Sequence, residues 1–287
     1  MARCEVCFRH CEIEEGKTGF CLARTCSGGV VKPANYGKIT ASALDPIEKK
    51  PLRHFHPGSM IFSIGSYGCN LRCPFCQNHT ISWSEKAAVF ADRANGSAGG
   101  SSPEDIVQAA VRLKQRGNIG IAFTYNEPLI GWEFVRDTAK LAKEQGLLNV
   151  MVTNGTASTD VLRQLLPYID AMNIDLKAFT DRFYSQLIKG NLDMVKYFIQ
   201  EAVRSCHVEL TTLVIPGEND SVAEIRKLSS WIAGLDGIVP GKEIPLHISR
   251  FFPAFHMTDR SATSVAQVYR LAEAARENLL YVYTGNC

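Results

Sequence analysis

Short apolar runs alternate with amphipathic stretches from residue 60 to the end of the chain. Six of the runs have the length and character of buried strands, and they cover residues 60–66, 119–124, 148–153, 169–175, 207–214 and 243–250. Each is followed by a stretch with helical periodicity, at residues 103–116, 131–145, 158–166, 192–205, 221–235 and 264–277. A further strand is expected at 279–284. Strict alternation of this kind predicts parallel strands joined by right-handed crossovers.

Capping residues mark where the helices begin. Ser102, Pro103 and Asp105 stand in the order of a cap, a first-turn proline and an acidic residue. Eight strand–helix units close a full barrel, whereas six predict an α/β fold in which residues 60–287 form an open, partial (β/α)6 barrel like three quarters of a TIM barrel. The gap on the open side would admit a large substrate.

The length of the chain agrees with this fold, and its charge gives no sign of binding to nucleic acid or an anionic membrane. The 287 residues suffice for one α/β barrel with an appendage, and a hydrophobic content of 46% provides a large core. The net charge is only +2 and both signs are mixed along the chain, so nothing in the charge pattern requires nucleic acid or an anionic membrane. No N-terminal apolar segment or apolar run of about 18 residues occurs, which predicts a soluble, cytoplasmic protein.

The cysteines point to a more specific chemistry. The chain has ten, and eight of them fall within the first 76 residues. In a reducing compartment, clustered cysteines indicate metal rather than disulfides. Cys69, Cys73 and Cys76 directly follow the first barrel strand with the spacing C-x3-C-x2-C. Three thiolates are one too few for a [4Fe–4S] cluster, so one iron would be left for a ligand that is not protein. Structural zinc is the alternative, although it usually has four ligands in paired arms.

The first 59 residues lack the strand–helix pattern. Residues 1–30 form a cysteine-rich arm with too few apolar residues for a core of its own, so the arm is expected to be held by metal. The sequence leaves three alternatives open for its thiols: a tetrahedral zinc site, a second iron–sulfur cluster, or free thiols. Residues 31–59 read as a linker with one short strand near 37–44, and its basic residues are expected to form a solvated face. They are Lys49, Lys50, Arg53 and His54.

Hydrogen-bonding residues follow all six predicted strands. Besides the cysteines they include Tyr125 to Glu127 after the second strand, Asn154 after the third, Asp175 and Lys177 at the fourth, Thr211 and Thr212 in the fifth, and His247 and Ser249 in the sixth. The carboxyl ends of parallel barrel strands meet on one side. The sequence therefore predicts a polar ligand cavity there, with the cysteines at its edge.

Three segments carry a resemblance to a known family. The surroundings of Cys69, Cys73 and Cys76 resemble the signature of the radical S-adenosylmethionine (SAM) enzymes. Residues 45–52 (DPIEKKPL), 73–78 (CPFCQN) and 123–129 (FTYNEPL) are similar to one branch of them, the radical enzymes of the AmmeMemoRadiSam system (AmrS), which are relatives of the pyruvate formate-lyase activating enzymes. The resemblance runs from Cys4 to Cys287, and in the arm it matches Cys4, Cys7, Cys11 and Cys21, with Cys26 as an addition.

This resemblance implies two cofactors, a [4Fe–4S] cluster on the triplet and SAM. The reduced cluster would cleave SAM to methionine and a 5′-deoxyadenosyl radical that takes hydrogen from an unknown substrate, small molecule or protein. A flavodoxin or ferredoxin would supply the electron.

Residues at the strand ends match different parts of SAM. Asn126 and Glu127 would accept from its amino group, Asn154 and Asp175 suit its ribose hydroxyls or charge, and Lys177 would pair with its carboxylate. His247 resembles a matching position of the activating enzymes. Tyr125-Asn126-Glu127-Pro128 departs from the family, because many radical enzymes have Gly-Gly-Glu-Pro there.

Two other functions remain open. An activase that places a glycyl radical on a partner enzyme uses the same chemistry, but many activases carry extra cysteines just after the triplet, and residues 77–111 have none. In the remaining alternative, the cysteines hold zinc in a binding module without catalytic activity.

Overall fold

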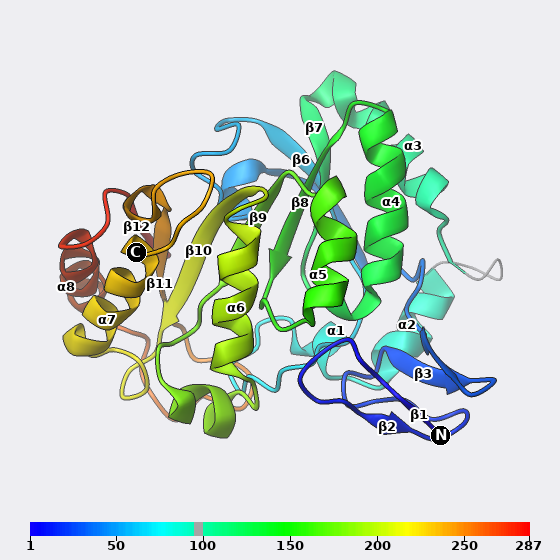
Figure 1. Ribbon diagram of the computed structural model, residues 1–287, viewed down its shortest axis with the longest axis horizontal. Coiled ribbons are helices and arrows are strands. Elements are labelled where there is room, and N and C mark those ends of the chain that lie inside the picture. The colour runs from blue at the N-terminus through cyan, green and yellow to red at the C-terminus, as the bar shows by residue number, and fades with distance from the viewer. Residues whose placement is uncertain (95–99) are drawn as a thin grey trace.

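The sheet that organises the molecule has eight strands, and their order follows the chain. The computed structural model describes residues 1–94 and 100–287. The strands are β5 (Ala41–Pro46), β6 (Met60–Gly65), β7 (Asn118–Phe123), β8 (Leu148–Thr153), β9 (Ala171–Asp175), β10 (His207–Val214), β11 (Leu246–Arg250) and β12 (Val282–Gly285). Neighbours from β6 to β12 are parallel, and β5 lies antiparallel to β6 at one edge. The predicted α/β fold with parallel strands and an open sheet is confirmed (Figure 1).

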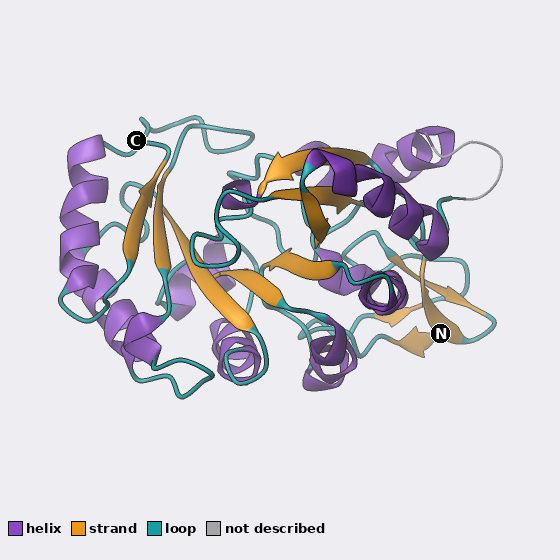
Figure 2. Ribbon diagram, turned by 90° about the horizontal axis from the view of Figure 1, so that it is seen from above, coloured by secondary structure: helices purple, strands orange, loops and turns teal. Residues whose placement is uncertain are grey.

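Helices connect the parallel strands and lie along the outer side of the curved sheet (Figure 2). They are α3 (Pro103–Arg112), α4 (Trp132–Glu144), α5 (Thr159–Leu165), α6 (Leu192–Ala202), α7 (Val222–Ala233) and α8 (Val265–Arg276). Two more, α1 (His79–Ser82) and α2 (Lys86–Ala94), precede the first crossover. Ser102 is the N-cap of α3 as predicted, and it forms a capping box with Asp105. No helix in the described part of the chain combines the length and apolarity needed to cross a bilayer.

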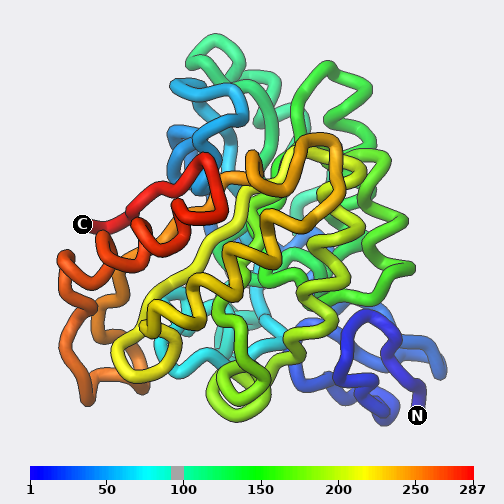
Figure 3. Tube along the Cα trace, turned by 60° about the vertical axis from the view of Figure 1, so that its left-hand side comes forward, coloured from blue at the N-terminus to red at the C-terminus, as the bar shows by residue number. Residues whose placement is uncertain are grey.

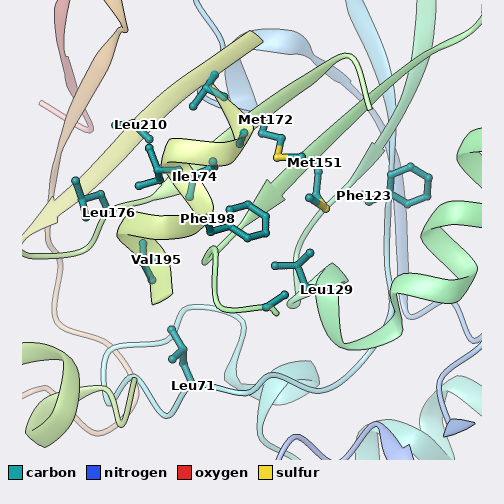
Figure 4. Close-up of a cluster of buried hydrophobic side chains, with 14 of the residues drawn as sticks. Leu71, Phe123, Leu129, Met151, Met172, Ile174, Leu176, Val195, Phe198 and Leu210 are labelled. Carbon is teal, nitrogen blue, oxygen red and sulfur yellow. The ribbon is translucent and has the colours of Figure 1, made fainter. Parts of the chain in front are cut away.

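The main core lies between the sheet and these helices. Figure 4 shows Met151 of β8 with Met172 and Ile174 of β9, facing Val195 and Phe198 of α6. All five side chains are at most 1% exposed. Complete burial of an aliphatic or aromatic side chain contributes about 1.5–3 kcal/mol. The core therefore fixes the carboxyl ends of the central strands, from which the polar residues project.

The cysteine-rich arm packs against the end of the barrel at which β8 terminates (Figure 1). It contains two small antiparallel ladders, β1 (Ala2–Arg3) with β2 (Glu12–Ile13) and β3 (Arg24–Ser27) with β4 (Val30–Pro33). The buried Arg24 guanidinium contacts both carboxylate oxygens of Glu133 in α4 at 2.7 Å. The Ser158 amide donates to the Val6 carbonyl at 2.8 Å. Figure 3 shows the two termini on opposite sides of the molecule.

The region between the arm and the barrel contributes to the sheet through β5. Within it Lys50 is only 3% exposed, and its ammonium lies 2.9 Å from an Asp45 carboxylate oxygen. The expectation that Lys50 belongs to a solvated face is therefore wrong, because a neighbouring carboxylate pairs the buried charge. Lys49, Arg53 and His54 are exposed as expected.

Glu209 of β10 joins this region to the barrel interior. Its buried carboxylate accepts hydrogen bonds from the backbone amides of Arg53 and His54, at 2.7–3.0 Å. The ring nitrogens of His207 and His247 lie 3.0 and 2.6 Å from its oxygens. Burial alone would raise the pKa of Glu209, but these hydrogen bonds lower it to about 2. The ionised carboxylate is thus strongly favoured in the folded protein.

We expect Glu209→Gln to lower the free energy of unfolding at pH 7 by about 3 kcal/mol, the equivalent of a pKa depressed from 4.5 to about 2. Because the folded-state pKa is depressed, this stabilisation is complete above about pH 4.5 and is lost as the pH falls toward 2. Urea unfolding at several pH values measures it. The variant should lose this part of the pH dependence, whereas Glu144→Gln, at an exposed position of α4, should keep it. Equal pH profiles for Glu209→Gln and the parent protein would contradict the assignment.

Candidate active site

The loop that carries the three cysteines follows β6. Residues of other segments hold it in place. The Asn126 side chain accepts from the Ser66 amide at 2.9 Å and donates to the carbonyls of Tyr67 and Gly68 at 3.1 and 3.2 Å. Gly68 has a φ of 88°, and a Cβ atom there would lie 2.4 Å from the Cys21 carbonyl oxygen. Only glycine fits this conformation and this approach, so the path of the loop into the triplet is fixed.

One cavity of about 290 Å³ lies at the carboxyl ends of β6 to β11 and brings most of the predicted residues together. Its lining includes all three triplet cysteines and six of the seven predicted cofactor residues, namely Cys69, Cys73, Cys76, Tyr125, Asn126, Glu127, Asn154, Asp175 and Lys177. The volume is close to the lower limit, about 300 Å³, of pockets that hold small organic ligands. The predicted convergence of strand ends on a ligand cavity therefore agrees with the structure.

Some lining residues were not singled out from the sequence. Gln77 and Asn78 follow the last triplet cysteine directly, and Ser82 lies one turn further in α1. Their closeness in sequence to Cys76 is a signal that could have found them. Asn286 also lines the cavity, and no local pattern distinguishes this residue near the end of the chain.

The triplet thiols are suited to metal rather than to free thiolate chemistry. Burial raises the pKa of Cys73 to about 12 and raises those of Cys69 and Cys76 as well, so all three are protonated at neutral pH without metal. The Leu71 amide donates to the Cys69 sulfur at 3.4 Å, and the Asn154 side-chain amide lies 3.7 Å from it. Such N–H groups tune iron–sulfur clusters. These residues fit a cluster whose loading releases protons.

Tyr125 connects three segments of the chain at the edge of the cavity. Its hydroxyl donates to Asp45 at 2.9 Å, and the Lys50 ammonium lies 4.8 Å from the centre of its ring. The Asn78 side chain donates to its backbone carbonyl at 2.7 Å. Tyr125 has a φ of 71°, a left-handed conformation that usually costs a side chain about 1–3 kcal/mol. The tyrosine therefore keeps a backbone conformation that favours glycine and adds side-chain contacts to it.

Glu127 presents a buried carboxylate to the cavity. One oxygen accepts from the Leu129 amide and the Thr153 hydroxyl, at 3.0 and 2.7 Å, and the other accepts from the Asn154 amide at 2.8 Å. A carboxylate has about four acceptor positions, so three donors leave one for a ligand. Burial raises the pKa of Glu127 to about 7. A cationic ligand would favour the ionised form.

Lys177 supplies the positive charge of the site. Its partly buried ammonium lies 2.8 Å from the Asp175 carboxylate. Burial alone would lower the pKa of Lys177, but the charge of Asp175 and its hydrogen bond to the ammonium raise it above its usual value. The lysine therefore remains charged beside the cysteine sulfurs and can pair with an anionic group of a ligand.

His247 is the predicted cofactor residue that does not line the cavity. On β11 it is paired in register with Thr211 of β10, and Thr211 and Ser249 both reach the cavity. The His247 ring instead bonds to Glu209 at 2.6 Å, and its side chain is 8% exposed. His247 thus bonds to Glu209 and does not line the cavity.

Comparison with known proteins identifies the family. A sequence profile of the Radical SAM superfamily matches residues 63–229, which include the triplet and the ends of β6 to β9. The chain belongs to the radical SAM superfamily. Radical SAM enzymes use a [4Fe–4S] cluster and SAM, and the residues of this cavity fit both.

Individual relatives support the same family. An uncharacterized protein of Methanocaldococcus jannaschii is 39% identical over 99% of this chain and 81% of its own length. The pyruvate formate-lyase-activating enzyme of Clostridium pasteurianum is 27% identical over 63% of this chain and 72% of its own. Among solved structures, SuiB of Streptococcus suis bound to SAM matches with a TM-score of 0.55 and 16% identity over 77% of this chain and 48% of its own. This last similarity shows the radical SAM fold.

The contacts of Tyr125 lead to a stability prediction. Tyr125→Phe removes a hydrogen bond to the Asp45 carboxylate, and hydrogen bonds to charged groups are worth about 1.5–3 kcal/mol. We expect urea unfolding to show a loss of that size. Tyr197→Phe is the matched control, because the Tyr197 ring is exposed on α6, and it should change stability by less than about 0.5 kcal/mol. Equal losses in the two variants would contradict this role of Tyr125.

Proposed function

We propose that this protein is a radical SAM enzyme of the AmrS type, which binds its cluster on Cys69, Cys73 and Cys76 and binds SAM in the adjoining cavity. When bound and reduced, the cluster supplies the electron that cleaves SAM to methionine and a 5′-deoxyadenosyl radical, which takes hydrogen from a substrate. The observation that carries this proposal is the single cavity that the triplet shares with six predicted cofactor residues.

Some side chains around the cavity are free to contact SAM, and others already bond within the protein. Glu127 keeps one acceptor position for a ligand and Lys177 keeps its positive charge, so we assign the amino group of SAM to Glu127 and its carboxylate to Lys177. Asp175 is partly exposed and pairs with Lys177, which it keeps charged. Asn126 and Asn154 use their amides within the protein, on the cysteine loop and beside Cys69. We therefore give these two amides positioning roles rather than the ligand contacts expected from sequence.

The contacts of Tyr125 support the more specific AmrS assignment. The three segments on which that resemblance rests are residues 45–52, 73–78 and 123–129. They meet at Tyr125, through its contacts to Asp45, Lys50 and Asn78. The three segments therefore contact one another beside the cavity. We expect this arrangement if the three segments together set the function of the AmrS branch.

A glycyl-radical activase is the second candidate, because pyruvate formate-lyase-activating enzymes of Clostridium pasteurianum and Escherichia coli are among the relatives. A partner-dependent glycyl radical in electron paramagnetic resonance (EPR) spectra would favour it. Either enzyme needs a low-potential electron donor, for which a flavodoxin or ferredoxin is suitable. The module without catalysis is set aside, because the chain belongs to a family of enzymes.

Anaerobic reconstitution tests the proposal. The iron-loaded protein should convert SAM with dithionite into methionine and 5′-deoxyadenosine, both measured by chromatography. The Cys73→Ala variant should lose this product, whereas Cys206→Ala, at a buried thiol outside the cavity, should retain it. A fully loaded protein that yields no 5′-deoxyadenosine would overturn the proposal.

Lys177→Met should weaken SAM binding without removing the cluster. A charged hydrogen bond is worth about 1.5–3 kcal/mol, so the dissociation constant should rise roughly ten- to a hundredfold. Equilibrium dialysis of the iron-loaded, unreduced protein measures the affinity, and iron analysis checks that the cluster remains. Lys140→Met, on the exposed side of α4, is the control. Unchanged affinity in Lys177→Met would exclude a contact between Lys177 and SAM.

A further inference from the structure

Four cysteines of the arm surround a second, much smaller cavity. Its lining includes Cys4, Cys7, Cys11 and Cys21. The Cys4 amide donates to the Cys11 carbonyl at 2.9 Å beside the β1–β2 ladder, which brings these two residues together. The fifth cysteine of the arm, Cys26, does not line the cavity, and its thiol bonds to Glu15 at 3.4 Å. Four of the five arm cysteines therefore line this cavity, and the fifth does not.

The size of this cavity bears on one of the two metal sites that the sequence leaves open, the single zinc ion. It has about 10 Å³ of room, which corresponds to about one water-sized sphere. Such a sphere, of about 1.4 Å radius, stays roughly 3 Å from a sulfur nucleus, whereas Zn–S bonds are about 2.3 Å long. Four sulfurs closed around one zinc ion would leave no such room. The four sulfurs therefore do not close around a single ion in this structure.

The triplet sulfurs likewise do not close around a single ion. Across residues 1–94 and 100–287, no three His, Cys, Asp or Glu side chains converge closely enough to hold a single metal ion, and this includes both cysteine groups. Radical SAM enzymes place a cluster on the triplet. The spacing of the arm sulfurs is therefore compatible with a cluster site of the same kind.

We propose that Cys4, Cys7, Cys11 and Cys21 hold a second iron–sulfur cluster, with one thiolate on each iron of a [4Fe–4S] cube. Thiolate is the ligand that such clusters require. Because all four irons have a cysteine, none is left to bind SAM. The chemistry of this centre is then limited to holding and releasing one electron.

Two direct connections place this centre beside the triplet. The Cys69 amide donates to the Cys21 carbonyl at 3.2 Å. On the second route, the Asn70 side chain contacts the Cys7 sulfur and accepts from Asn154 at 3.0 Å, and the same Asn154 amide lies 3.7 Å from the Cys69 sulfur. The arm thus holds a one-electron carrier next to the site that consumes one electron per SAM cleaved. A low-potential flavin or iron–sulfur protein would reduce it. This role rests on the proposed function, whereas the cluster site does not.

Iron counting in a variant without the triplet tests the site directly. After anaerobic reconstitution, the parent protein should contain about eight irons per chain, and Cys69→Ala/Cys73→Ala/Cys76→Ala should retain about four, with matching sulfide. Mass spectrometry of the metals should find no stoichiometric zinc. About one zinc per chain, or a triplet variant without iron, would overturn the proposal. Neither result depends on SAM cleavage, so failure here is distinct from failure of the proposed function.

EPR of the triplet variant tests the ligand set and the absence of an open iron. The dithionite-reduced variant should show a cluster signal that added SAM leaves unchanged, and a shift caused by SAM would contradict four-cysteine ligation. Adding Cys11→Ser should abolish the signal and the remaining iron, whereas Cys26→Ser should preserve both. Loss of iron in the Cys26→Ser background alone would show that the ligands are assigned wrongly. Thermal unfolding verifies that each variant is folded.

Discussion

The position of the triplet depends on hydrogen bonds that its loop makes to other parts of the chain. Asn126 follows β7 and binds the loop that follows β6, and these two strands are parallel neighbours in which Ile64 is paired with Phe123. The register of the sheet therefore sets where the cysteines lie. On the other side, the Cys21 carbonyl of the arm closes over Gly68. Hydrogen bonds and close contacts of the protein itself thus hold the loop between barrel and arm.

The ionisable side chains that line the cavity have a low net charge, mainly because they are buried. The triplet thiols are neutral because burial raises their pKa values, and Lys177 is balanced by Asp175. Glu127 has a pKa of about 7, so it is poised between its two forms. The low dielectric that makes free thiolates costly also strengthens attraction between a loaded metal and its ligands. Deprotonation and loading are therefore expected to occur together.

The sequence predicted what depends on local spacing and missed what depends on tertiary pairing. The bounds of β8 and β10 match their apolar runs, and the triplet was recognisable because its cysteines lie within eight residues. In contrast, Lys50 resembled a surface lysine in a basic run until Asp45 was seen to pair with it. His247 shares its strand with Ser249, which reaches the cavity, but its ring bonds to Glu209 on the neighbouring strand instead. Sequence alone contains neither contact.

Packing against the barrel helps to determine the conformation of the arm. Val6 and Ile13 belong to the same buried cluster as the barrel core, and Cys21 packs with Tyr67 and Ile130 of the barrel. The small cavity is closed on one side by Asn70, the residue after the first triplet cysteine. A shift of the arm would therefore change the surroundings of Cys69 and of the arm thiols together. Because of this shared boundary, a metal centre in the arm would stabilise the loop of the triplet even before it exchanged an electron.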